Sequence, residues 1–151
     1  MNLTQIKAQA RRLAVLAGLL PAACGFFEAP PPANPLVGTW STADHNQVIF
    51  RADAIVVKPD KGQAATMGPG DCNGVYKLQY GRMATAALQK SFSSQADLTN
   101  KLKQLLVKPD YPVVDVTCDH GGTTYLMLDD NRMLAVYRDA GVGGLEAYSR
   151  L

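Results

Sequence analysis

The chain of 151 residues is short of the side chains that build most metal centres. It has three cysteines and two histidines, His45 and His120. A structural zinc site needs four well-spaced Cys or His ligands, which this sequence does not supply. Each histidine follows an aspartate, but both pairs lie in predicted turns, where we interpret them as surface residues. We therefore expect no bound metal.

Familiar catalytic signatures are also missing. The sequence contains no Gly-x-Ser-x-Gly elbow, phosphate-binding loop or dinucleotide fingerprint. The stretch Asp129-Asp130-Asn131 lacks the other ligands and the distal glutamate of a calcium loop, and a hairpin turn accounts for it. Neither histidine has an obvious nucleophile beside it. The sequence therefore predicts that the protein is not an enzyme and has no cofactor.

An excess of charge of one sign is lacking as well. The chain has 15 Lys and Arg against 13 Asp and Glu, a net charge of +2. Three of the basic residues, Lys7, Arg11 and Arg12, precede an apolar run, and residues 1–23 contain no acid. Without them 12 basic side chains remain against 13 acidic ones, a net charge of −1. A nucleic-acid-binding domain needs a clustered positive face, so nucleic acid is excluded as a partner.

No hydrophobic run is long enough for a permanent membrane span. The longest apolar stretch covers residues 13–20, whereas a transmembrane helix needs about 20 apolar residues. A positively charged segment precedes this stretch, and the small residues of Pro21-Ala22-Ala23 follow it. This order is typical of a secretory signal peptide, which we assign to residues 1–23.

Cys24 comes directly after those small residues. The segment Leu19-Leu20-Pro21-Ala22-Ala23-Cys24 resembles the lipobox of bacterial lipoproteins; it matches at Ala22, Ala23 and Cys24 and departs at Pro21, where a branched aliphatic residue is usual. The resemblance implies cleavage before Cys24 and lipidation of its thiol. Gly25, in place of Asp, then favours the outer membrane, with the protein facing the periplasm. Ordinary cleavage after Gly25, which would give a soluble periplasmic or secreted protein, is the alternative.

A proline-rich stretch separates Cys24 from the rest of the chain. Four of the eight residues 28–35 are prolines, and proline favours extended polyproline-like chain of about 3.1 Å per residue. We interpret residues 24–35 as a lipidated cysteine with its tether. Residues 36–151 then form a single folded domain, a length that suits one hydrophobic core.

Cys72 and Cys118 are left as an even pair in an exported chain. In an oxidising periplasm the default expectation is a disulfide between them. It would close a loop of about 47 residues, which is worth about 4 kcal/mol in the chain-entropy account. Two separate buried thiols are the alternative.

The domain is predicted to be mainly β. Short strands separated by turn residues are predicted at 37–41, 47–50, 54–57, 74–80, 113–118, 123–128, 132–138 and 145–150. Connections this short demand antiparallel neighbours. We therefore expect a small antiparallel β-barrel, or a strongly curved sheet, of seven to nine strands. Residues 84–92 fit either a strand or a helix, and a strand is favoured.

One amphipathic helix is expected inside this series of strands, over about 95–107. Ser94-Gln95-Ala96-Asp97 fits a capping box, and Leu98, Leu102, Leu105 and Leu106 recur on one stripe. Pro109 ends the pattern. We expect the leucine stripe to pack on the domain core.

Gly38-Thr39-Trp40 resembles the Gly-x-Trp signature of lipocalins and related small bacterial barrels. In those families the Trp closes one end of the barrel and a basic residue of the last strand lies across its ring. The resemblance implies these barrel-closing roles for Trp40, the only tryptophan, and for Arg150 or Arg138. Periplasmic inhibitors of proteases share the small barrel, an early Gly-x-Trp and one disulfide, and are often lipoproteins.

Two functions fit these features. The first is a non-catalytic lipoprotein of the cell envelope whose barrel binds another envelope protein, as an inhibitor or an assembly accessory. Residues 62–70 or the proline-rich segment would make the contact. The second is a lipocalin-like carrier that holds a small apolar ligand.

Overall fold

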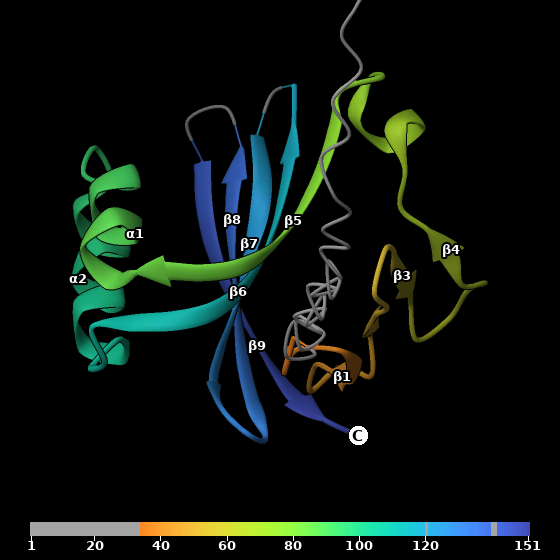
Figure 1. Cartoon of the computed structure of the whole chain (residues 1–151), viewed down its shortest axis with the longest axis horizontal. Helices are drawn as coiled ribbons and strands as arrows, with labels where there is room; N and C mark the ends of the chain where they lie inside the picture. Colours follow the sequence, from red (N-terminus) through yellow and green to blue (C-terminus); the bar gives the residue numbers. More distant parts are fainter. Residues whose placement is uncertain (1–33, 120, 140–141) are drawn as a thin grey trace, which may run out of the picture. The chain divides into compact units, whose positions relative to one another are not determined.

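A computed structural model describes residues 34–119, 121–139 and 142–151, which contain nine strands, two α-helices and a short 3-10 helix (Figure 1). Cys24 and most of the predicted tether lie outside these residues. The elements, in chain order, are β1 (Gly38–Ser41), β2 (Gln47–Phe50), β3 (Ile55–Lys58), β4 (Ala65–Thr66), η1 (Pro69–Cys72), β5 (Tyr76–Ala84), α1 (Thr85–Ser91), α2 (Ala96–Leu105), β6 (Asp110–Cys118), β7 (Gly121–Asp129), β8 (Arg132–Asp139) and β9 (Val142–Arg150).

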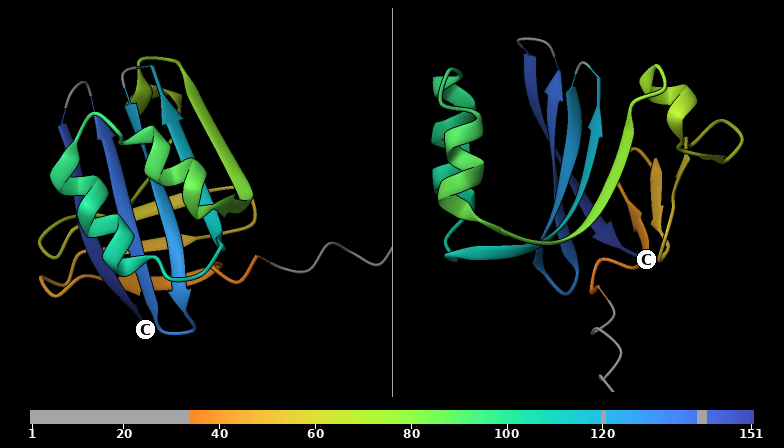
Figure 2. Two further views of the ribbon diagram at one scale, coloured as in Figure 1. Left: turned by 90° about the vertical axis from the view of Figure 1, so that its left-hand side faces the viewer. Right: turned by 45° about the horizontal axis from the view of Figure 1, so that its top comes forward.

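All of these strands join one antiparallel sheet in the order β4-β3-β2-β1-β9-β8-β7-β6-β5. The last five strands follow one another as a meander, and β1 pairs with β9 to attach the first four. The sheet curls strongly, so that β1 to β3 lie across one face of the long strands (Figure 2). The predicted fold, a mainly β protein with a strongly curved sheet of seven to nine antiparallel strands, is confirmed.

The core has two layers because the long strands are buried on both faces. Along β8, Met133 and Ala135 belong to a cluster on the concave side, together with residues of β1 and β2. Leu134 and Val136, the alternate residues, belong to a second cluster beneath α1 and α2. Side chains of a strand point alternately to opposite faces, so one continuous apolar run serves both clusters.

Residues 85–91 form the helix α1, so the favoured prediction of a strand over 84–92 is wrong except at Ala84, the last residue of β5. Ala86, Ala87 and Leu88 are strong helix formers. Leu88 and Phe92 are buried in the cluster beneath the helices, and their spacing of four residues places both on one helix face. The region between β5 and β6 therefore holds two helices instead of the single one expected.

α2 lies where a helix was predicted but begins and ends slightly inside the expected 95–107. The predicted cap is wrong, because Gln95 is the N-cap and no side chain caps the helix. Gln95 Oε1 instead accepts a hydrogen bond from the Gly143 N–H of β9 at 2.8 Å. Leu98, Leu102 and Leu106 are buried, whereas Leu105 is 46% exposed.

Several strands extend beyond their predicted bounds, since pairing between strands overrides local propensity. β5 pairs with β6 as far as Met83↔Tyr111 and Ala84↔Asp110, and Pro112 lies within that ladder opposite Arg82. The β6–β7 register begins only at Val113, so Pro112 is flanked by one strand. β4, which is two residues long, carried no sequence pattern that predicted it.

Gly122 occupies a backbone position that other residues tolerate poorly. Its φ is +153°, and a Cβ atom there would lie 2.0 Å from the carbonyl oxygen of Val116 in the neighbouring strand. Backbone atoms of a paired strand cannot move aside as the end of a flexible side chain can. Gly122 therefore allows β7 to begin close against β6, next to Cys118.

We expect Gly122→Ala to lower the free energy of unfolding by about 2–3 kcal/mol, because it adds both backbone strain and a steric clash. Gly81→Ala is the matched control: a Cβ atom at Gly81 in β5 would meet no other atom within 4 Å, so the substitution should change stability by less than about 1 kcal/mol. Urea denaturation of the intact chain measures both. Equal effects of the two substitutions would contradict this account of Gly122.

Candidate functional site

Trp40 and Arg150 meet where β1 pairs with the C-terminal end of β9. Trp40 is fully buried, and its Nε1 donates a hydrogen bond to the Leu36 carbonyl at 2.8 Å. The Arg150 guanidinium lies 4.4 Å from the centre of the indole ring. Arg150 also donates to the carbonyls of Asp130, at 2.8 Å, and Pro35, at 2.5 Å. One guanidinium thus contacts the start of the domain at Pro35, the β7–β8 turn at Asp130 and the buried ring of Trp40.

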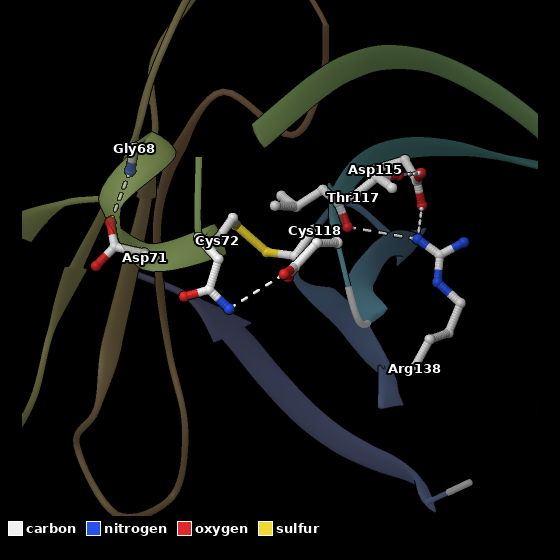
Figure 3. The surroundings of a disulfide bond; sticks show 10 residues. Gly68, Asp71, Cys72, Asp115, Thr117, Cys118 and Arg138 are labelled. Atoms are coloured by element: carbon white, nitrogen blue, oxygen red, sulfur yellow. Dashed lines mark hydrogen bonds and ion pairs between the residues drawn. A yellow bond between two sulfur atoms is a disulfide. The ribbon is translucent and has the colours of Figure 1, made fainter. Parts of the chain in front are cut away.

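Arg138, the other candidate for the contact with Trp40, lies elsewhere. It forms an ion pair with Asp115 of β6 at 2.6 Å. The Thr124 hydroxyl donates to the same carboxylate at 2.5 Å and the Thr117 hydroxyl at 3.2 Å. Figure 3 shows this polar cluster next to Cys118. The arginine that lies across the tryptophan ring is therefore Arg150.

Cys72 and Cys118 lie at disulfide distance, with their Cα atoms 4.8 Å apart (Figure 3). The link joins η1 to the last residue of β6, and Cys72 is fully buried. Next to it the Asn73 amide donates to the Asp119 carboxylate at 3.1 Å. A crosslink over this length of chain is worth about 4 kcal/mol in the chain-entropy account. It holds the segment before β5 against the rest of the sheet.

Residues 62–70, which the sequence singled out as a contact segment, are largely exposed. All of residues 58–66 are exposed. The segment is nevertheless held at its middle, where Ala65 pairs with Val57 and the Met67 N–H donates to the Ile55 carbonyl at 2.8 Å. The Gly68 N–H donates to the Asp71 carboxylate at 2.7 Å, one residue before Cys72. It is a projecting hairpin and loop with a defined backbone.

A cluster of tyrosines around one glutamate was not predicted from the sequence. Five of the six tyrosines belong to the concave-side cluster or pack against it. The hydroxyls of Tyr137 and Tyr148 both donate to Glu146 Oε2, and the two hydroxyls lie 3.3 Å apart. The ring of Tyr125 packs edge-on against Tyr148, with centroids 6.3 Å apart. We call Tyr125, Tyr137, Glu146 and Tyr148 the tyrosine–glutamate cluster.

Burial keeps the phenols of this cluster protonated. Burial, together with the hydrogen bond to the Glu146 carboxylate, raises the pKa of Tyr137 to about 12, because that bond requires the phenol proton. Burial also raises the pKa values of Tyr125 and Tyr148 far above the ordinary range. These phenols are therefore hydrogen-bond donors at neutral pH, and neither nucleophiles nor bases.

The described residues considered for metal binding lie in turns or at the end of a strand. His45, in the β1–β2 turn, has a φ of 63°, and its N–H donates to the Thr42 carbonyl at 3.1 Å. Asp129 accepts from the Asn131 N–H and pairs with Arg132; its hydrogen bond from Arg132 is the main cause that lowers its pKa. His120 lies outside the described residues. Within the described ranges no three His, Cys, Asp or Glu side chains gather closely enough to hold a metal ion.

The described surface includes the following two open pockets. The larger, about 330 Å³, lies between the start of α2 and Gly143 and Gly144 of β9. The other, about 290 Å³, is lined by residues that include Arg82, Met127 and Asp129. Among the described helices none has the length and apolar content needed to cross a membrane.

The fold and these residues define a class: a curled, barrel-like antiparallel β domain with two helices on one face and a cysteine pair at disulfide distance. No protein-family model, curated protein or solved structure matches the chain.

The buried phenols give a testable pH dependence. An unfolded chain has tyrosine pKa values of about 10, so between about pH 10 and pH 12 the folded state binds more protons than the unfolded state. The stability associated with these protonated phenols is present below pH 10 and is lost as the pH rises through 12. We expect phenolate absorbance of the intact chain to rise in two steps, the second coinciding with loss of tertiary structure. A single step near pH 10 with the fold intact would contradict the burial of these hydroxyls.

Proposed function

We propose that this protein is a non-catalytic lipoprotein of the cell envelope whose barrel-like domain binds another envelope protein through residues 62–70. The observation that carries this proposal is the combination of exposure and fixation in that segment. Its hairpin projects from the sheet with every residue from 58 to 66 exposed. The β3–β4 pairing holds its middle, and the Cys72–Cys118 link holds the residues that directly follow it.

Fixation matters because ordering a loop on binding costs free energy, about 0.5–1.5 kcal/mol for each immobilised flexible side chain. A segment that is already ordered avoids much of that cost. Inhibitors that fill the cleft of an enzyme with a rigid loop use this principle, and the small residues at 64–66 would allow close approach to a partner. This geometry supports the proposed role of an inhibitor or an assembly accessory.

The lipid anchor and the location at the outer membrane are also part of the proposal. Lipidation at Cys24 would place the domain on the outer membrane, facing the periplasm, on a tether that ends at residue 35. The first described residues support an abrupt end of the tether, because Asn34 donates to the Val113 carbonyl and Arg150 to that of Pro35. A soluble periplasmic or secreted form is the alternative.

Protein binding is favoured over the alternative of a carrier for a small apolar ligand. A carrier needs an open apolar lumen. On the concave side of this sheet, Trp40, Phe50 and Tyr125 are buried and pack in one cluster, and the ring of Phe50 lies 4.9 Å from that of Tyr125. A filled core of this kind suits a binding module.

The test compares two arginine substitutions in captures from envelope extracts of the source cells. Ala64→Arg changes the exposed hairpin, and Ala87→Arg changes another exposed position, on α1, on the opposite side of the sheet (Figure 1). We expect the intact chain and Ala87→Arg to capture the same partner, with Ala64→Arg binding it at least about tenfold more weakly, a loss of about 1.4 kcal/mol. Equal capture by Ala64→Arg, or no partner for the unsubstituted chain, would contradict the proposal.

A further inference from the structure

We propose that the tyrosine–glutamate cluster is a binding site for a small organic cation, an alkylammonium group. This inference does not depend on the proposed protein partner. The site consists of the Glu146 carboxylate and the two phenols that donate hydrogen bonds to it, Tyr137 and Tyr148. The ring of Tyr125 packs against that of Tyr148.

Glu146 is a carboxylate without a cationic partner among the described residues. Both phenols donate to its Oε2, and its Oε1 has no hydrogen bond within the described part of the chain, although it is not sealed from solvent. The ion pairs of the described residues instead join arginines to Asp110, Asp115 and Asp129. Partial burial of a carboxylate is costly unless a charge or hydrogen bonds compensate it. Two neutral phenols do so only in part, and Oε1 remains available to a donor.

The surroundings of Glu146 suit an organic cation. Aromatic faces attract cations, and groups of aromatic side chains recognise quaternary ammonium ligands. Tyr125 and Tyr148 are almost fully buried, whereas Tyr137 and Glu146 are partly exposed, so the cluster opens to solvent on their side. The hydroxyl of Tyr76, which packs against the same core cluster, is buried without a hydrogen-bond partner among the described residues.

Other classes of ligand fit less well. An anion would be repelled by Glu146, and an apolar molecule would leave the carboxylate uncompensated. Calcium needs six to eight oxygen ligands, and no group of three acidic, His or Cys side chains occurs among the described residues. The alkylammonium group alone uses both features of the site, the carboxylate and the rings. It could belong to a free amine or to a lysine side chain.

Calorimetric titration of the intact chain with two cations and a neutral control tests the site. Tetramethylammonium represents a methylated amine, n-butylammonium represents a lysine side chain, and tert-butanol has a similar size without charge. We expect at least one cation to bind with a Kd of about 1 mM or tighter, and tert-butanol to bind at least about tenfold more weakly. The preferred cation then indicates the source of the ammonium group.

Glu146→Gln removes the charge while keeping the shape, and should weaken cation binding at least about tenfold. Asp129→Asn, which neutralises a carboxylate at the end of β7, is the matched control and should leave binding unchanged. Added salt should weaken binding of the cation to the unsubstituted chain but not that of tert-butanol, a readout that does not depend on how a variant folds. The absence of saturable binding to the folded chain, equal binding of tert-butanol, or unchanged binding by a folded Glu146→Gln would overturn the proposal.

Discussion

The short pairing between β1 and β9 is the contact on which the rest of the structure depends. Two residue pairs, Trp40↔Arg150 and Ser41↔Ser149, form this register, and the Leu151 N–H adds a bond to the Thr39 carbonyl at 3.0 Å. The pairing joins two hairpin systems that are far apart in sequence into one sheet. Arg150 stabilises it by lying across the buried Trp40, a contact worth about 0.5–2 kcal/mol. Without it, β1 to β3 would lose their place over the concave side.

Different interactions hold the two ends of the long strands. At the end with Trp40, one arginine and one indole ring link the first strand, the last strand and the β7–β8 turn. Toward the other end, the cysteine pair holds η1 to β6. The tyrosine–glutamate cluster lies between, on the concave side along the middle of β8 and β9, where Ala135 pairs with Glu146. The exposed hairpin at 62–70 depends on both ends, because β3 reaches the sheet through β2 and β1 while η1 is held through Cys72.

Much of the fold was predictable because the relevant signals are local. Alternation and turn residues located eight of the nine described strands, and the spacing of Leu98, Leu102 and Leu106 located α2. α1 was missed because its short run of Ala and Leu fits a strand as well as a helix. β4 was missed because two residues are too few to show the alternation of a strand. The tyrosine–glutamate cluster was missed for a different reason. Tyr137 and Glu146 lie on neighbouring strands, and only the β8–β9 register, which pairs Ala135 with Glu146, brings their side chains together.

Hydrogen exchange of the intact chain and of Arg150→Met tests the central claim most directly. The substitution keeps an unbranched apolar side chain over Trp40 but removes the charge and the bonds to Pro35 and Asp130. If the β1–β9 contact holds the first strands in place, amides of β1 to β3 should exchange about tenfold faster, a loss of about 1.4 kcal/mol, while those of β6 to β8 stay protected. Unchanged exchange in β1 to β3, or an equal acceleration throughout the sheet, would contradict the account.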